Sequence, residues 1–112
     1  MSGYSADWLR TQACAAGGGA KRLDDAAIDD SLQSLPGWSR EGGVLRKNFR
    51  FPDYYRTIAF VNAVAWIANQ QDHHPDLDVH YNRCGVDFST HDAGGITLND
   101  LICAARVDAL GA

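Results

Sequence analysis

Four histidines, His73, His74, His80 and His91, are the residues best suited to acid–base chemistry, and all of them fall in one short stretch. Imidazole is the side chain whose ordinary pKa lies nearest to neutral pH, so it can both donate and accept a proton there. His73 and His74 precede Pro75, which ends a helix because its ring and missing N–H break the hydrogen-bond ladder. His91 lies where a strand is expected to end. Side chains at such boundaries can converge on one pocket, so His73, His74 and His91 form a candidate proton-transfer site.

Other interpretations of these histidines stay open. Adjacent histidines can form a solvated helix end, where a protonated imidazole is favoured by the negative end of the helix. Histidines also bind zinc and copper, although adjacent residues seldom both reach one metal ion. No cysteine or carboxylate lies at a familiar ligand spacing, which disfavours a metal site. His80 lies between Val79 and Tyr81 in an expected strand and is interpreted as exposed or structural.

The composition limits the class of protein. The chain has 112 residues, 46% of them apolar, which allows one folded domain and excludes a disordered chain. The longest nearly apolar run, residues 58–68, is shorter than the roughly 20 residues that span a bilayer. A net charge of -4 argues against direct binding to nucleic acid. Cys14, Cys84 and Cys103 are widely and irregularly spaced, which supports neither a disulfide framework nor a zinc site and indicates a reduced, cytoplasmic setting.

Residues 1–22 differ in composition from the rest of the chain. The run of alanine and glycine from Ala15 to Ala20 has no hydrophobic periodicity and high backbone entropy, so residues 1–22 are predicted to be a flexible tail. Their composition faintly resembles an organelle transit peptide, but they lack the arginine and serine richness of one. The folded domain is therefore expected over residues 23–112.

Hydrophobic periodicity predicts the order helix-strand-strand-helix-strand-strand-helix. Helices are expected over residues 24–34 and 54–71 and from Thr97 onward, where Thr97 and Asp100 form a capping box. Strands are expected over residues 38–41, 44–51, 79–81 and 86–90. Hairpins separated by helices predict an α+β fold, in which a four-stranded antiparallel sheet has three helices packed on one face.

The chain resembles the pterin-4a-carbinolamine dehydratase family, whose animal members are also dimerisation cofactors of a hepatocyte nuclear factor. The family signature is His-His-Pro, an aromatic residue, a histidine and an aspartate, which here are His73-His74-Pro75, Tyr81, His91 and Asp100. Supporting matches are Leu35-Pro-Gly-Trp38, Phe49-Arg-Phe51-Pro-Asp53 and Ser89-Thr90-His91, and the resemblance covers about residues 20–110. The chain departs from the family at Asn69, where an acidic or otherwise ionisable residue is usual, and at Leu77, where animal members tend to have an aromatic residue.

The resemblance implies dehydration of 4a-hydroxytetrahydrobiopterin, the pterin-4a-carbinolamine left by aromatic amino acid hydroxylases, to quinonoid dihydropterin during tetrahydrobiopterin recycling. It implies that His73, His74 and His91 are catalytic, with acid and base unassigned, and that no metal or redox cofactor is needed. Asp72 is a candidate for orienting an imidazole. The substrate-binding residues are expected to be Asp72, His73, His74, Pro75, Ser89, Thr90, His91, Asp92 and Ala93.

A second class of function remains open on the same scaffold, namely a non-catalytic protein-interaction, assembly or transcriptional coactivator role. Animal relatives bind the dimerisation helices of a transcription factor, and plant relatives assist assembly of a carbon-fixing enzyme. The presence of all three histidines favours catalysis, whereas Asn69 mildly favours the scaffold role. The resemblance also implies a homodimer or homotetramer, which the unpaired edges of a four-stranded sheet make physically reasonable.

Overall fold

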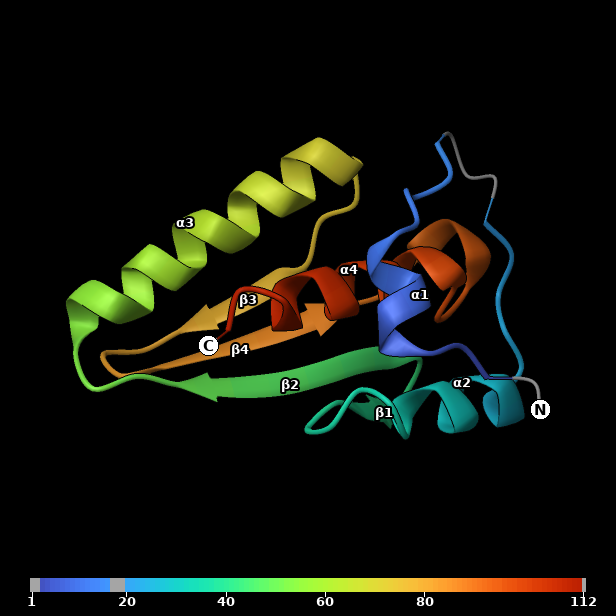
Figure 1. The fold of residues 1–112 in the computed structure, drawn as a ribbon, viewed down its shortest axis with the longest axis horizontal. Helices are drawn as coiled ribbons and strands as arrows, with labels where there is room; N and C mark the ends of the chain where they lie inside the picture. The colour runs from blue at the N-terminus through green and yellow to red at the C-terminus, as the bar shows by residue number, and fades with distance from the viewer. Residues whose placement is uncertain (1–2, 17–19, 112) are drawn as a thin grey trace.

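The computed structural model describes residues 3–16 and 20–111 of the chain. Its elements follow in the order α1 (Ala6–Arg10), α2 (Asp25–Leu32), β1 (Ser39–Glu41), β2 (Val44–Arg50), α3 (Tyr54–Gln71), β3 (Asp76–Val79), β4 (Arg83–Phe88), the short 3-10 helix η1 (His91–Ala93) and α4 (Leu98–Asp108) (Figure 1). The strands form one antiparallel sheet in the order β1-β2-β4-β3. The predicted α+β fold with a four-stranded antiparallel sheet is confirmed.

The helices begin where short polar side chains cap them. Asp24 and Asp53 accept hydrogen bonds from backbone N–H groups in the first turns of α2 and α3, each at 2.8 Å. At α4, Thr97 and Asp100 form the predicted capping box. These caps satisfy N–H groups that have no partner inside the helix, which explains why the helices start at these positions.

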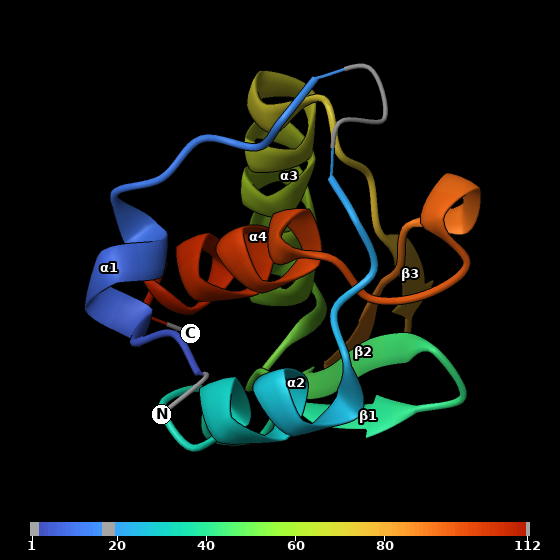
Figure 2. The same ribbon diagram turned by 90° about the vertical axis from the view of Figure 1, so that its right-hand side faces the viewer.

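The core lies between the sheet and the helices that cover one of its faces (Figures 1 and 2). Leu45 of β2 and Val86 and Phe88 of β4 are fully buried on this face. Val64 of α3 and Leu101 of α4 are fully buried opposite them. Because strand side chains alternate between faces, these residues alternate with polar ones that point away from the helices.

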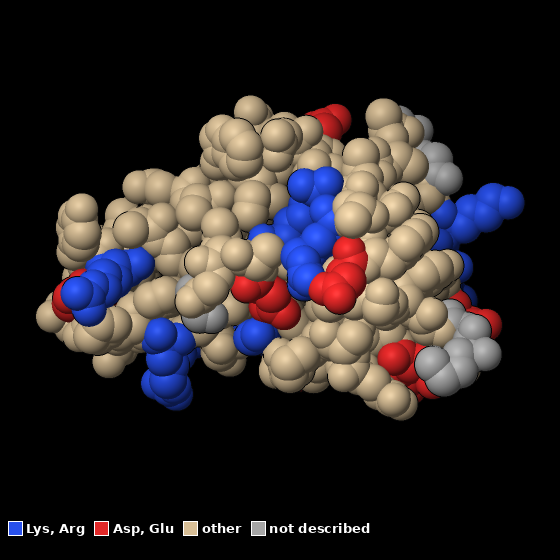
Figure 3. Space-filling view, viewed as in Figure 1, with Lys and Arg blue, Asp and Glu red and all other residues tan. Residues whose placement is uncertain are grey.

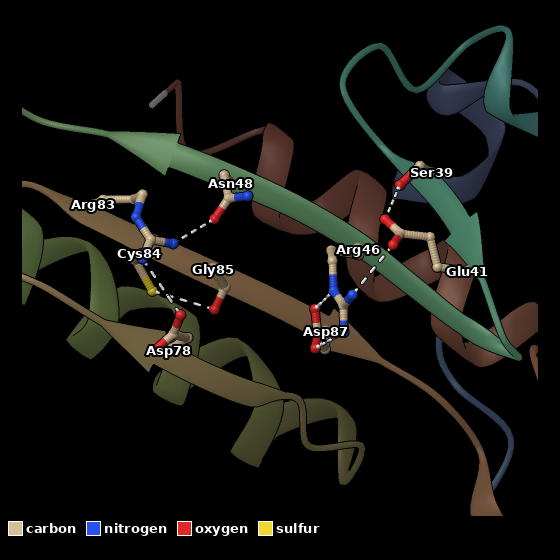
Figure 4. Close-up of polar contacts among 9 residues, drawn as sticks. All are labelled: Ser39, Glu41, Arg46, Asn48, Asp78, Arg83, Cys84, Gly85 and Asp87. Carbon is tan, nitrogen blue, oxygen red and sulfur yellow. Dashed lines mark hydrogen bonds and ion pairs between the residues drawn. The ribbon is translucent and has the colours of Figure 1, made fainter.

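The opposite face of the sheet carries paired charges (Figure 4). Arg46 of β2 donates two hydrogen bonds to Asp87 of β4, both at 2.8 Å. Arg83 of β4 donates to Asn48 of β2 at 2.8 Å. On the side of the molecule drawn in Figure 3, Lys and Arg lie in small separate groups, several of them beside Asp or Glu. This distribution agrees with the net charge of -4 read from the sequence.

The segment before α2 differs from the flexible tail expected there. Residues 6–10 form α1, which packs on α4 (Figure 2), and Leu9 is fully buried between them. Arg106 of α4 donates two hydrogen bonds to the Gln12 carbonyl, and Asn99 exchanges two hydrogen bonds with the Ala15 backbone. Periodicity missed this helix because one buried leucine in so short a stretch makes no repeating pattern. The glycine run, residues 17–19, lies outside the described residues.

The third strand also starts earlier than expected. β3 follows Pro75 directly and ends at Val79, because Val79 pairs with Cys84 and the residues between them must form the turn. Tyr81 therefore lies in the turn, where it is exposed and stacks on Tyr54. None of the helices in the described ranges is long and apolar enough to cross a bilayer.

Candidate active site

Two chain segments meet beside each other and line an open pocket of about 320 Å³. One segment follows α3 and the other follows β4, as expected for side chains at element boundaries. Of the nine predicted substrate-binding residues, Pro75 and Ala93 do not line this pocket. The seven that do are Asp72, His73, His74, Ser89, Thr90, His91 and Asp92.

Asp72 turns the chain at the end of α3. Its backbone is left-handed, with φ 51°, a conformation that aspartate tolerates better than most residues. The backbone N–H groups of Asp72 and His73 then donate hydrogen bonds to carbonyls in the last turn of α3. The N–H of His73 donates to the Ala68 carbonyl at 3.1 Å. This turn closes the helix and directs the following residues toward the start of α4.

Among the described residues that line this pocket, His73 makes the shortest polar contact, and it does so through its ring. Its Nε2 lies 2.5 Å from Oδ1 of Asp100 in the first turn of α4. The His73 side chain is only 12% exposed, and the Asp100 side chain is completely buried. The imidazole also lies parallel to the Phe88 ring, with 6.0 Å between centroids. The aspartate and the phenylalanine together determine where the His73 ring lies.

The second oxygen of Asp100 extends this contact into a network. Oδ2 accepts a hydrogen bond from the Thr90 hydroxyl and another from the Thr97 backbone N–H, each at 2.8 Å. The Thr90 and Thr97 hydroxyls are 2.9 Å apart. Asp100 therefore caps α4 and holds His73 with the same carboxylate, so the buried charge is satisfied on both oxygens.

Asp100 also changes the proton affinity of His73. The hydrogen bond to Asp100 raises the pKa of His73 above its ordinary value of 6.5, and burial opposes this rise without cancelling it. The nearby charges of Asp100, Cys14 and Asp72 act in the same direction as the hydrogen bond. His73 consequently keeps its proton to a higher pH than a free histidine, while Nδ1 is not engaged by the carboxylate.

His74 and His91 differ from His73 in exposure and in bonding. Both are exposed residues at the pocket wall. Within residues 3–16 and 20–111, neither ring makes a hydrogen bond to the protein. Their ring nitrogens are thus available to a ligand in the pocket.

A second hollow of about 280 Å³ shares the lining residues Ser89, Thr90 and His91 with the first. Its other wall consists of glycines from two turns, Gly42 and Gly43 after β1 and Gly94 and Gly95 after η1, together with Val44. The Thr90 N–H donates to the Gly95 carbonyl at 3.0 Å, which holds the second turn against the end of β4. The histidine pocket therefore has a glycine-lined hollow as its neighbour, and the two share one wall.

Sequence reasoning placed the three histidines in one pocket but chose a different carboxylate for the imidazole. Asp72 is exposed, and the carboxylate bonded to His73 belongs to Asp100. Asp100 was visible in the sequence both as the last signature residue and as the capping-box acid. Asn69 is exposed on α3 and lies outside the pocket wall. His80, as expected, is exposed, and it bonds Asp78 at 3.0 Å on the β3 edge.

Within the described ranges of the chain, no group of three or more His, Cys, Asp or Glu side chains is arranged to hold a metal ion.

Comparison with known proteins identifies similar sequences over most of the chain. The sequence model of the family described as "Pterin 4 alpha carbinolamine dehydratase" matches residues 21–110. A relative from Chromobacterium violaceum, named "Putative pterin-4-alpha-carbinolamine dehydratase", is 60% identical over 92 residues, or 82% of this chain and 85% of its own length. A relative of the same name from Stenotrophomonas maltophilia is 55% identical over 95 residues, or 83% of this chain and 82% of its own.

Two solved structures are similar in fold. A transcriptional coactivator/pterin dehydratase from Brucella melitensis matches with a TM-score of 0.79 and 29% identity, over 82% of this chain and all of the other. A pterin dehydratase-like protein identified as a RuBisCO assembly factor in the alpha-carboxysome matches with a TM-score of 0.58 and 28% identity, over 66% of this chain and 88% of the other.

Proposed function

Because this chain belongs to the pterin-4-alpha-carbinolamine dehydratase family, we propose that it is a hydro-lyase that converts 4a-hydroxytetrahydrobiopterin to quinonoid dihydropterin. In this role it would act in tetrahydrobiopterin recycling in the cytoplasm. The observation that carries the proposal is the His73–Asp100 pair in one pocket with His74 and His91. One imidazole with a raised pKa beside two exposed imidazoles supplies both an acid and a base.

The proposed reaction needs two proton transfers. The hydroxyl on C4a must be protonated so that it leaves as water, and the proton on N5 must be removed so that a C4a=N5 double bond forms. His73, held protonated by Asp100 through Nε2, is the proposed acid and donates from Nδ1. His91, whose ring makes no hydrogen bond to the described residues, is the proposed base, and His74 is proposed to assist it at the same pocket wall. General acid–base catalysis of this kind contributes about 10²–10⁴-fold in rate.

The remaining pocket residues are proposed to position the pterin. The Thr90 hydroxyl and N–H are already engaged by Asp100 and the Gly95 carbonyl, so Thr90 supports the pocket and leaves little to donate to a ligand. Polar contacts to the pterin ring are therefore assigned to Ser89 and Asp92. The glycine-lined hollow is proposed to accommodate the side chain at C6 of the pterin, because it shares Ser89, Thr90 and His91 with the histidine pocket.

The proposal is tested by stopped-flow absorbance with 4a-hydroxytetrahydrobiopterin generated in the mixing cell. We expect dehydration by the purified protein well above the spontaneous rate, and loss of this excess in His91→Ala. The matched control is His80→Ala, because His80 is also an exposed histidine and does not line the pocket. Equal rates for the His91→Ala variant and the parent would refute the proposed site.

A protein-interaction role is the alternative, favoured by one surface feature. α3 presents Tyr55 and Trp66 to solvent, 82% and 65% exposed, and an apolar groove lies beside Trp66 between α3 and α4. A homodimer or homotetramer formed partly through such surfaces is part of the proposal, and light scattering after size exclusion measures it. Binding of a partner protein without turnover of the pterin would favour the alternative over the enzyme.

A further inference from the structure

Two cysteines that are 89 positions apart in sequence lie in contact. Cys14 follows α1, and Cys103 lies in the middle of α4. Their Sγ atoms are 3.6 Å apart. A disulfide requires about 2.05 Å between sulfur atoms, so a shift of about 1.5 Å would bring them to bonding distance.

Several hydrogen bonds hold Cys14 in this position. Its backbone N–H donates to Oε1 of Gln71 at the end of α3, at 2.9 Å. The next residue, Ala15, is bonded through its N–H and its carbonyl to the Asn99 side chain, at 2.9 and 3.1 Å. The contact between the sulfur atoms is thus built by the backbone of the N-terminal segment, which runs along α4 and passes the end of α3 (Figure 2).

The two thiols differ in exposure and in proton affinity. Cys103 is completely buried, whereas Cys14 is partly exposed. The hydrogen bond from the Cys103 thiol lowers the pKa of Cys14, and the same bond together with burial raises the pKa of Cys103. Cys14 is therefore the accessible sulfur that ionises first, and Cys103 keeps its proton.

We propose that Cys14 and Cys103 form a redox-sensitive thiol pair that two-electron oxidants of the hydroperoxide class convert to a disulfide, which fastens the N-terminal segment to α4. The family match begins at residue 21, so it does not include Cys14. The pair is consequently a site of this chain that the dehydratase fold alone does not supply.

The chemistry balances with one peroxide per pair of thiols. The Cys14 thiolate attacks one peroxide oxygen, the O–O bond breaks, and with one proton the products are a sulfenic acid and water or an alcohol. The Cys103 sulfur then attacks the Cys14 sulfur, the S–O bond breaks, and the Cys103 proton leaves with the hydroxide as water. The two sulfurs together lose two electrons, and the peroxide gains them.

Cys84 provides a matched control. It is also fully buried, but it lies on β4 with its Sγ near the Gly85 carbonyl, and burial raises the pKa of its thiol. Within the described residues, neither of the other cysteine sulfurs contacts it. It should therefore not join a disulfide within the same chain.

The test is oxidation of the full chain with one equivalent of hydrogen peroxide, followed by thiol titration and peptide mapping without reductant. We expect free thiols to fall from three to one, a Cys14–Cys103 linked peptide, and reversal by dithiothreitol. Cys84→Ser should form the same linked peptide at the parental rate, and Cys14→Ser should form none. A folded parent that loses no thiols, or that links Cys84, would overturn the proposal.

A second measurement assigns the order of attack and does not depend on the disulfide being stable. In Cys103→Ser the reaction should stop at the sulfenic acid, so dimedone should label residue Cys14. In the parent, treated with peroxide and dimedone together, labelling should be much weaker because Cys103 resolves the intermediate. The proposed roles would be contradicted by the opposite pattern. In that pattern dimedone labels Cys103 in the Cys14→Ser variant, and it labels Cys14 neither in the parent nor in Cys103→Ser.

Discussion

Replacing Asp100 with asparagine separates the charge of this residue from its shape. Asparagine has the same outline but offers one acceptor oxygen and one donor NH₂ in place of two acceptor oxygens. If its oxygen faces the Thr97 N–H, its NH₂ faces Nε2 of His73, 2.5 Å away in the parent. Only a neutral imidazole can accept that hydrogen bond. Asp100→Asn should therefore lower the pKa of His73, because the hydrogen bond that raises it in the parent is lost.

The free-energy loss expected in Asp100→Asn follows from the type of hydrogen bond between His73 and Asp100 and from its burial. A hydrogen bond to a charged group contributes about 1.5–3 kcal/mol and a neutral one about 0.5–1.5 kcal/mol, so the difference is roughly 1–1.5 kcal/mol. The Asp100 side chain is completely buried, so water does not screen this difference away. A loss of this size corresponds to about a tenfold fall in kcat.

The assay is the pH dependence of kcat for dehydration of 4a-hydroxytetrahydrobiopterin. If His73 is the acid, activity falls as pH rises through the His73 pKa. Because the pKa is lowered in Asp100→Asn, the alkaline limb of the profile should move to lower pH while kcat falls about tenfold. An unmoved alkaline limb would refute the assignment of His73 and Asp100, even if the rate had fallen.

Thr97→Ala is the matched control for the capping role of this network. It removes the hydroxyl that accepts a hydrogen bond from the Asn99 N–H and contacts Thr90, but it leaves the Asp100–His73 pair in place. We expect a loss of about 1 kcal/mol in unfolding free energy, measured by urea denaturation, with the parental pH profile. A shifted profile in Thr97→Ala would mean that helix capping, and not the carboxylate charge, sets the proton affinity of His73.

Three further predictions test other parts of the structure. His91→Ala should lower kcat by about 10²–10⁴-fold while His80→Ala leaves it unchanged, and circular dichroism should show both variants folded. Leu9→Ala should lower the unfolding free energy, measured by urea denaturation, by about 2–5 kcal/mol, because Leu9 is fully buried. A loss below about 0.5 kcal/mol would mean that α1 does not pack on the domain in solution. Cys14→Ser should lower the pKa of His73, because the charge of Cys14 raises that pKa in the parent. NMR titration of the His73 ring measures it, and an unchanged or higher pKa would contradict this electrostatic interaction.

Much of the fold was predictable because local signals agreed with the tertiary structure. The long helix was expected over residues 54–71 and is observed as Tyr54–Gln71, because Asp53 caps its start and Pro75 prevents its continuation. The capping box at Thr97 likewise marked the start of α4. These signals depend on neighbours within a few residues, so they can be read in sequence order.

α1 and the true span of β3 were not predictable in this way. α1 has only one buried residue, Leu9, and it is held by contacts to α4 almost a hundred positions later. The end of β3 is determined by pairing of Val79 with Cys84 on the neighbouring strand, and the alternation of Val79 and Tyr81 carries no information about that pairing.

For the candidate site, the amino-acid sequence by itself determined which residue types are present and which segments carry them. The three histidines next to Pro75 and at the end of β4 could be recognised because the ends of helices and strands are local features. Only the tertiary structure decided that Asp100, and not Asp72, holds the His73 ring, and that Cys14 meets Cys103. Both are contacts between segments distant in sequence, and their geometry arises from how α3, α4 and the N-terminal segment pack, which no spacing along the chain records.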